Sequence, residues 1–422
     1  MTPEQSALRK VTRRLLPFLF LLYIVCFLDR VNIGFAALQM NHDLGFSPAV
    51  YGFGAGIFFL GYVLFEVPSN LMLARVGARR WIARIMITWG IIASAMMFVR
   101  GPLSLFALRF LLGAAEAGFF PGMIYYLSGW FPAAERARAI ARFMVAIPLS
   151  GVVGGPLSGA LLDLNGRWGL AGWQWLFLLE GLPAVALGVV VLRRLSDRPE
   201  DAAWLTPAER AAISIRLRQE HEQCEQGLSV RQALANGTIW RLALLFMVGN
   251  AFGVYVLGLW LPQIVRDVSG LGNLGVGMLS AVPNLVAAVA MVLVGSHSDR
   301  SGERPLHLAV AATAAAVGLG VSASLGSTAV VIFGLSVAAA GLLSMHGPFW
   351  PLPSTFLSGS AAAAGIALIT SVANLGGFLG PYAMGLLKGH TGSFRSGLLL
   401  LALMSVVGGI LAVRLRHDPR LR

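Results

Sequence analysis

Charged residues are scarce in this chain of 422 residues: Asp, Glu, Lys and Arg together make up 12% of it, whereas hydrophobic residues make up 57%. Soluble domains carry about 25% charged residues, so a soluble globular protein is excluded. Cysteine is just as scarce, since only Cys26 and Cys224 occur, and they give no disulfide framework. The composition therefore predicts a protein that crosses a membrane many times.

Sequence motifs of catalysis and of nucleotide binding are missing too. The chain has no P-loop, no His-Glu-x-x-His set and no Gly-x-Ser-x-Gly set. We therefore expect no enzyme activity, no cofactor and no use of ATP. A membrane sensor that binds a small molecule without moving it stays an alternative, and an appended signalling domain would distinguish it.

Apolar runs of about 20 residues, the length that crosses a bilayer, alternate with short polar breaks. We expect twelve transmembrane helices at 15–38, 49–73, 81–99, 103–127, 138–162, 172–194, 239–264, 275–296, 306–325, 328–352, 361–387 and 394–414. The fold class is then an all-α membrane protein with two pseudo-symmetric six-helix bundles, an N-terminal one over 1–195 and a C-terminal one over 239–422.

The segment 196–238 is the only long polar stretch and is expected to link the two bundles in the cytoplasm. Thr206 and Glu209 form a capping box around Pro207 at the first helical position. Apolar residues then recur at helical spacing to about Gly227. We expect an amphipathic linker helix that lies on the membrane surface.

Positive charge is in excess, with 32 Lys and Arg against 19 Asp and Glu. Arg30 and Arg109 fall within predicted spans. Five basic residues fall in the loops opposite the two ends of the chain: Arg100, Arg167, Arg266, Lys388 and Arg395. The positive-inside rule then places both termini in the cytoplasm, and the basic excess suits a lipid bilayer rather than nucleic acid. We expect a multi-pass protein of a bacterial inner membrane that works as a monomer.

Two different patterns recur at one offset. The Arg-x-Gly of 75–77 returns at 300–302, and the Gly-x3-Gly-Pro of 151–156 returns at 376–381, both shifted by 225 residues. Agreement of two independent patterns on one shift indicates that the halves are structural repeats. Transporters built this way rock two bundles about a site near the middle of the membrane.

The segment 295–304 matches a Gly-x3-Asp-Arg-x-Gly-x-Arg loop motif, and with the repeat it makes the chain resemble the major facilitator superfamily. The first copy departs from the motif, with Asn70 for Gly and Ala74 for Asp. The resemblance implies that charged residues of these loops hold a cytoplasmic gate in the outward-open state. They are Arg75, Asp299 and Arg300.

Further segments narrow the resemblance to the anion:cation symporter family. They are 28–36 with Asp29-Arg30, 65–70 with Glu66, 109–121, 175–183 and 348–353. The resemblance implies proton-coupled import of small organic anions such as tartrate, aromatic acids or sugar acids. The partners expected are therefore the anion, protons and the bilayer.

Two arginines and two carboxylates are predicted to lie at similar depth in the N-terminal bundle. Asp29 and Arg30 lie about 20 Å from the inner face of a core about 30 Å thick, at a rise of about 1.5 Å per residue. Arg109 is equally deep in the fourth span, and Glu116 follows two turns below on the same face. Each buried charge costs about 2.5–3.5 kcal/mol at a helix centre. We therefore expect the four to line one water-filled cavity.

Their chemistry suggests separate roles. Arg30 is the expected anchor for a substrate carboxylate because arginine pairs with carboxylates through two hydrogen bonds; a permanent ion pair with Glu116 is the alternative. Asp29 and Glu116 are the expected proton carriers. Arg109 would pair with one of them and reset it, and a purely structural role is its alternative.

Polar and aromatic side chains elsewhere could complete a substrate site, with ordinary packing as the alternative for each. The candidates are Tyr62, Trp350, Thr370 and Asn374. Glu66 is expected to contact the gate, whereas Glu180 and His346 receive no role. The predicted function is a secondary active symporter that works by alternating access. An organic anion exchanger or exporter is the alternative, supported by the glycine pattern of 151–159, which close helix packing explains equally well.

Overall fold

The computed structural model describes residues 2–223, 235–324, 326–355, 359–416 and 418. In that part of the chain, eleven helices are long and apolar enough to cross a membrane, and a shorter apolar helix, Ala146–Leu162, occupies the fifth place in the order. The prediction of an all-α membrane protein with about twelve spans is confirmed. Cys224 and the predicted end of the linker helix near Gly227 lie outside the described residues.

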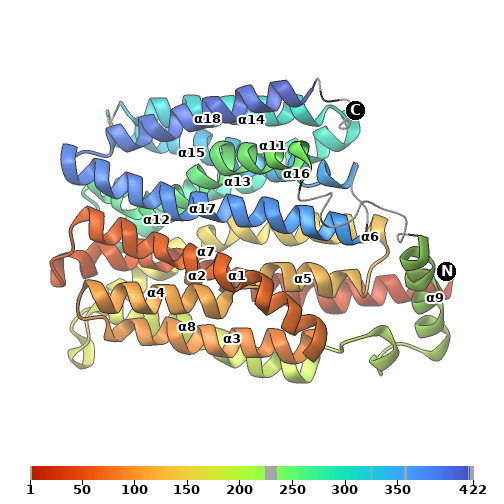
Figure 1. Cartoon of the computed structure of the whole chain (residues 1–422). Coiled ribbons are helices and arrows are strands. Elements are labelled where there is room, and N and C mark those ends of the chain that lie inside the picture. The colour runs from red at the N-terminus through yellow and green to blue at the C-terminus, as the bar shows by residue number, and fades with distance from the viewer. Residues whose placement is uncertain (1, 224–234, 325, 356–358, 417, 419–422) are drawn as a thin grey trace.

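The helices of the first half form one bundle. They are α1 (Pro3–Asp43), α2 (Pro48–Val76), α3 (Ala78–Ala95), α4 (Pro102–Glu116), α5 (Phe119–Ser128), α6 (Ala133–Met144), α7 (Ala146–Leu162) and α8 (Gly172–Arg194). The second bundle follows the linker helix α9 (Pro207–Gln223). It contains α11 (Gly237–Phe246), η4 (Met247–Ala251), α12 (Phe252–Ser269), α13 (Asn273–Ser301), α14 (Arg304–Ser322), α15 (Thr328–Ser344), α16 (His346–Phe349), α17 (Gly359–Thr391) and α18 (Arg395–Leu415). Figure 1 shows the two bundles side by side, with both termini and α9 at one end, called here the terminal end.

Several predicted spans are interrupted rather than continuous. The fourth span breaks between α4 and α5, directly after Glu116, where Gly118 adopts φ +84°. Only glycine takes this left-handed conformation without strain, and a side chain at Gly118 would also collide with Ser69. The seventh span carries the π-helical turn Met247–Ala251. Hydrophobicity alone does not register such breaks, because the residues on both sides remain apolar.

The first helix extends well beyond the predicted span 15–38 at its polar N-terminal end. Its first turn is closed by a capping box in which the Thr2 side chain accepts from the Gln5 amide. This extension gives α9 a surface to pack on: Glu209 accepts hydrogen bonds from Ser6 (2.6 Å) and Lys10 (2.9 Å). The predicted capping box of α9 is present, since the Glu209 amide donates to Thr206 and the Thr206 amide donates to Glu209.

The bundles meet where glycines let two backbones touch. A Cβ on Gly52 of α2 would lie 2.5 Å from the Pro381 carbonyl oxygen of α17, and a Cβ on Gly155 of α7 would lie 2.5 Å from the Gly277 carbonyl oxygen of α13. Lipid supplies no hydrophobic drive for helix association, so close packing of small residues stabilises such pairs. These contacts lie toward the distal end, opposite the termini. The glycine pattern of 151–159 therefore has a packing role between the bundles.

Candidate functional site

An ion pair between Arg30 and Glu116 lies at the centre of the N-terminal bundle. Arg30 Nε donates to Glu116 Oε1, and the side chains are 9% and 0% exposed. Cys26, one turn before Arg30, donates from Sγ to the same oxygen at 3.0 Å. The second oxygen of Glu116 and the Nη2 atom of Arg30 are buried and find no hydrogen-bond partner among the described residues. The pair is therefore incomplete on both sides.

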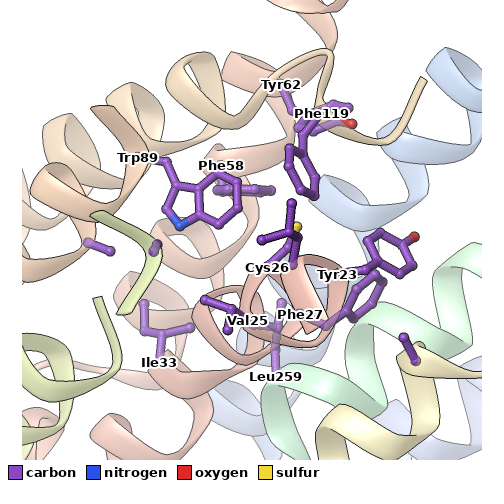
Figure 2. Packing of buried hydrophobic residues seen from close by; sticks show 14 of the residues in the cluster. Tyr23, Val25, Cys26, Phe27, Ile33, Phe58, Tyr62, Trp89, Phe119 and Leu259 are labelled. Carbon is purple, nitrogen blue, oxygen red and sulfur yellow. The ribbon is translucent and has the colours of Figure 1, made fainter. Parts of the chain in front are cut away.

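Aromatic rings surround the guanidinium of Arg30. Its Cζ atom lies 4.9 Å from the ring centre of Tyr62, 5.2 Å from that of Phe27 and 5.6 Å from that of Phe58. Figure 2 shows these rings packed around Cys26. Cation–π contacts of this kind hold a guanidinium in place without satisfying its hydrogen bonds. The structure thus brings Tyr62 to Arg30, although through its ring face.

Asp29 has partners of its own, as expected for neighbouring residues that point about 100° apart on a helix. The Trp89 indole donates to Asp29 Oδ2 at 2.7 Å, and the Asn32 amide donates to Oδ1 at 3.4 Å. Trp89 lies in the apolar third span, and nothing in the sequence indicated that it would donate a hydrogen bond to Asp29. Asp29 is consequently held by uncharged donors.

Arg109 differs most from expectation. Its Nη2 atom donates to the carbonyl oxygen of Ala55 at 3.1 Å, and its Cζ atom lies 4.9 Å from the centre of the Phe58 ring. Among the described residues the structure gives it no ion pair with Asp29 or Glu116. Phe58 lies against both Arg30 and Arg109, so an aromatic ring, rather than a shared carboxylate, connects the two cations.

A cavity lies between the bundles, with about 960 Å³ of empty space that includes its opening to solvent. Arg30 is the charged residue in its lining. Asp29, Arg109 and Glu116 are buried behind this wall, each 1% exposed or less. The expectation that all four line one cavity is therefore wrong, because the side chain of Arg30 alone reaches the space while the other three point into the helix packing of the bundle.

The C-terminal bundle supplies polar groups to the cavity that the sequence did not single out. The lining includes Tyr255 of α12 together with Ser280 and Asn284 of α13. The Tyr255 hydroxyl donates to Asn374 Oδ1 at 3.0 Å, so Asn374 supports the site through Tyr255. Tyr255 also packs its ring on Phe59 of the other bundle, with centroids 4.2 Å apart.

Two other predicted substrate contacts are occupied elsewhere. The Thr370 hydroxyl donates to the carbonyl oxygens of Ile366 and Ala367 in its own helix. The ring of Trp350 packs on that of Phe246, with ring centres 5.2 Å apart, and Trp350 is not part of the cavity lining. Both arrangements match the packing alternative.

Three further titratable residues, outside the predicted proton and substrate sites, have definite positions. Glu66 accepts from the Ser371 hydroxyl of α17 at 3.3 Å and so connects the two bundles, which suits the expected gate contact. Glu180 accepts from Ser158 at 2.7 Å within the N-terminal bundle. The Nδ1 atom of His346 lies 3.2 Å from the Leu343 carbonyl oxygen. No group of three or more His, Cys, Asp or Glu that could hold a metal ion occurs in the described part of the chain.

The two ends of the molecule differ in how they are held. At the distal end, the Asn273 amide of α13 donates to Asp163 after α7 at 2.8 Å, and Tyr51 of α2 donates to the Leu259 carbonyl oxygen of α12 at 2.6 Å. At the terminal end, Asp299 Oδ1 lies 3.8 Å from Arg304 Nη2, and both residues belong to the C-terminal bundle.

The predicted gate residues Arg75 and Arg300 have no ion pair among the described residues. The distal end is therefore held by hydrogen bonds between the bundles, whereas the predicted gate residues Arg75, Asp299 and Arg300 form no ion pair between the bundles in the described part of the chain.

The fold and this central cavity with Arg30 in its wall define a secondary transporter. The family model "Major Facilitator Superfamily" matches residues 19–381, and the chain belongs to this superfamily. It is a multi-pass membrane protein of a transporter family, not an enzyme. The resemblance drawn from the sequence motifs is confirmed.

Individual relatives refine the comparison. The chain is 53% identical over 421 residues to the "Putative tartrate transporter" of Agrobacterium vitis, an alignment that covers 99% of this chain and 93% of that protein. It is 40% identical over 410 residues to the "Quinolone resistance transporter" of Acinetobacter baumannii, with 97% and 94% covered. Among solved structures it resembles a bacterial homologue of the human lysosomal transporter Spinster in an inward-facing, occupied conformation, with TM-score 0.72, 19% identity, and 98% and 96% covered. The last likeness concerns the fold.

Proposed function

We propose that this protein imports a small organic anion, a hydroxy dicarboxylate such as tartrate, together with protons. The observation that carries the proposal is the incomplete ion pair of Arg30. One nitrogen of its guanidinium holds Glu116, while Nη2 lacks a partner among the described residues and the side chain lines the cavity. A carboxylate entering the cavity would complete the guanidinium with a second charge-assisted hydrogen bond.

Coupling follows from competition for Arg30. A charge buried without its partner is strongly unfavourable, at about 3–5 kcal/mol when one member of a pair is removed. When Glu116 takes up a proton, it no longer compensates Arg30, so the anionic substrate does so instead. Proton and anion are then bound together. A proton on Glu116 balances one carboxylate of the substrate and a proton on Asp29 balances the other, so the net charge of the site stays constant. Releasing the protons and the anion to the cytoplasm restores the Arg30–Glu116 pair.

The remaining charged residues have supporting parts in this scheme. Asp29 is the second proton carrier, because its carboxylate is held by the neutral donors Trp89 and Asn32 and has no ion-pair partner among the described residues. Arg109 acts through the electrostatic field of its fixed charge, since its guanidinium contacts the same Phe58 ring as that of Arg30. Both residues position the site rather than touch the substrate.

The C-terminal bundle would recognise the rest of the anion. Tyr255, Ser280 and Asn284 line the cavity from the C-terminal bundle, whereas Arg30 lines it from the N-terminal bundle. Hydroxyl and amide groups match the hydroxyls of a tartrate-like acid, because such groups both donate and accept. Since the two ends of the substrate contact different bundles, its binding would draw the bundles together, which is what alternating access requires.

Purified protein in sealed vesicles tests the proposal. With an imposed inward proton gradient, labelled tartrate should accumulate above its external concentration, and collapsing the gradient with an ionophore should abolish the accumulation. Counterflow of labelled for unlabelled tartrate, without any accumulation when the gradient is imposed, would instead show an exchanger. Binding without any flux would show a sensor. Either result contradicts proton-coupled import.

A further inference from the structure

A second pocket lies at the terminal end, where α1 begins and α8 ends, and it is separate from the transport cavity. It comprises about 1270 Å³ of space, part of it open to solvent. Its rim carries four cations: Lys10, Arg13, Arg14 and Arg194. No acidic residue occurs among the described residues that line it. We call this feature the basic pocket.

The cations and an apolar surface follow one another along a single helix face. Lys10, Arg14, Phe18 and Leu21 of α1 are spaced three or four residues apart, so their side chains lie on the same side of the helix. The charged residues come first, and the apolar ones follow toward the membrane interior. Leu21 is 44% exposed. The pocket thus changes from cationic to apolar in the direction that leads into the bilayer.

Aromatic rings hold two of the guanidinium groups in place. The Arg14 Cζ atom lies 5.3 Å from the centre of the Trp204 ring, and the Arg194 Cζ atom lies 5.7 Å from that of Phe18. Trp204 is itself stacked on the fully buried Trp130, with ring centres 5.6 Å apart and an interplanar angle of 13°. Because Trp204 precedes α9, the linker closes one side of the pocket.

We propose that the basic pocket binds an anionic phospholipid, with a headgroup phosphate between Arg14 and Arg194 and acyl chains along Phe18 and Leu21. Arginine recognises phosphate through paired hydrogen bonds, which accounts for the rim. A free phosphate ion would use the rim but leave the apolar floor unexplained. Basic pockets between helix ends on the cytoplasmic side are suited to lipid headgroups of this kind.

The test measures lipid-dependent thermal stability of the full-length protein in a neutral detergent. Phosphatidylglycerol should raise the melting temperature in a saturable way, whereas phosphatidylcholine with the same acyl chains and sodium phosphate at the same concentration should not. The proposal is overturned if phosphatidylcholine acts equally well. It is also overturned if inorganic phosphate alone reproduces the shift, since the site would then bind the free ion.

Substitutions in and outside the basic pocket test where phosphatidylglycerol binds. Each basic residue near an anionic lipid surface contributes about 1 kcal/mol, so the double variant R14Q/R194Q should bind phosphatidylglycerol about 30-fold more weakly. The control R80Q/R193Q removes the same charge from exposed positions at the same end that do not line the pocket, and it should bind as the wild type does. Equal loss in both variants would indicate unspecific attraction and contradict the proposal.

If the double variant does not fold, a second variant that leaves the charge unchanged still tests the proposal. Leu21→Gln alters an exposed part of the apolar floor and should weaken phosphatidylglycerol binding several-fold while retaining the dependence on the headgroup. Unaltered binding in this variant would mean that acyl chains do not lie along α1, and the lipid assignment would fall.

Discussion

Glu116 compensates Arg30 through one oxygen and one nitrogen only, at a point where α4 ends and the helix turns at Gly118. The pair is enclosed on the side of Glu116 and reaches the cavity on the side of Arg30. A carboxyl group that can take up a proton is thus placed behind the cation that would meet the substrate. The predictions for Arg30 and Glu116 below depend on that arrangement.

Replacing Arg30 with lysine should weaken substrate binding by about 10- to 100-fold. A lysine keeps the charge but cannot donate to Glu116 and to a second carboxylate in one plane, and a hydrogen bond to a charged group contributes about 1.5–3 kcal/mol. Isothermal titration of purified protein with tartrate measures the affinity. Arg84→Lys is the matched control, because Arg84 stacks on Trp81 outside the cavity. Equal affinities in wild type and Arg30→Lys would exclude Arg30 as the anchor.

Removing one hydroxyl from the opposite wall should have a smaller effect. Tyr255→Phe deletes the hydrogen bond to Asn374 and one polar group of the cavity lining, so tartrate affinity should fall about 5-fold, as expected for one net hydrogen bond of about 1 kcal/mol. Tyr382→Phe, whose ring packs on Phe53 away from this cavity, should leave affinity unchanged. If both variants bind alike, Tyr255 has no contact with the anion.

Adding a methyl group at Gly155 should force the bundles apart at the distal end. The new Cβ would lie 2.5 Å from the Gly277 carbonyl oxygen, and overpacking of this kind costs about 1–3 kcal/mol. A cysteine introduced at Leu274, near the distal contact, should then react faster with a water-soluble maleimide. Gly320→Ala is the control, since nothing lies within 4 Å of a Cβ there. An unchanged rate in Gly155→Ala would show that the glycine contact does not hold this end closed.

The contact between α9 and α1 should depend on pH only in strong acid. Hydrogen bonds from Lys10 and Ser6 lower the pKa of Glu209 to about 2, below its value of about 4.3 in an unfolded chain. A depressed pKa means that the stabilisation is complete above the unfolded value and is lost as pH falls toward 2. The melting-temperature difference between wild type and Glu209→Gln should therefore be constant from pH 8 to pH 5 and shrink below about pH 4. A difference that already changes between pH 8 and pH 6 would contradict this assignment.

The sequence predicted most of the fold because long apolar runs and the two-fold repeat report directly on membrane spans. It also identified Arg30, Asp29, Arg109 and Glu116, since buried charges are costly and stand out in such runs. It could not predict which of them meet, because pairing depends on side-chain direction and on the break after Glu116. For that reason the sequence offered the Arg30–Glu116 ion pair only as an alternative to a free Arg30 that anchors the substrate.

Some residues of the candidate site carried no signal in the sequence. Cys26, Trp89 and Tyr255 are residue types that occur in any apolar helix, and their hydrogen bonds to Glu116, Asp29 and Asn374 arise from contacts between distant segments. Helix periodicity places a residue on a face but does not say which helix it faces. In the predicted spans of the second bundle, charged side chains occur only near the ends, so no deeply placed charge indicated that this bundle contributes to the cavity.

The most direct test of the central claim is tartrate transport by Glu116→Gln in proteoliposomes. A glutamine keeps the size and a hydrogen-bond acceptor for Arg30 but cannot gain or lose a proton. The account predicts that accumulation driven by a proton gradient is lost while exchange of labelled for unlabelled tartrate continues. Accumulation at the wild-type level in this variant would contradict the account, because Glu116 could then not be the group that couples proton and anion movement.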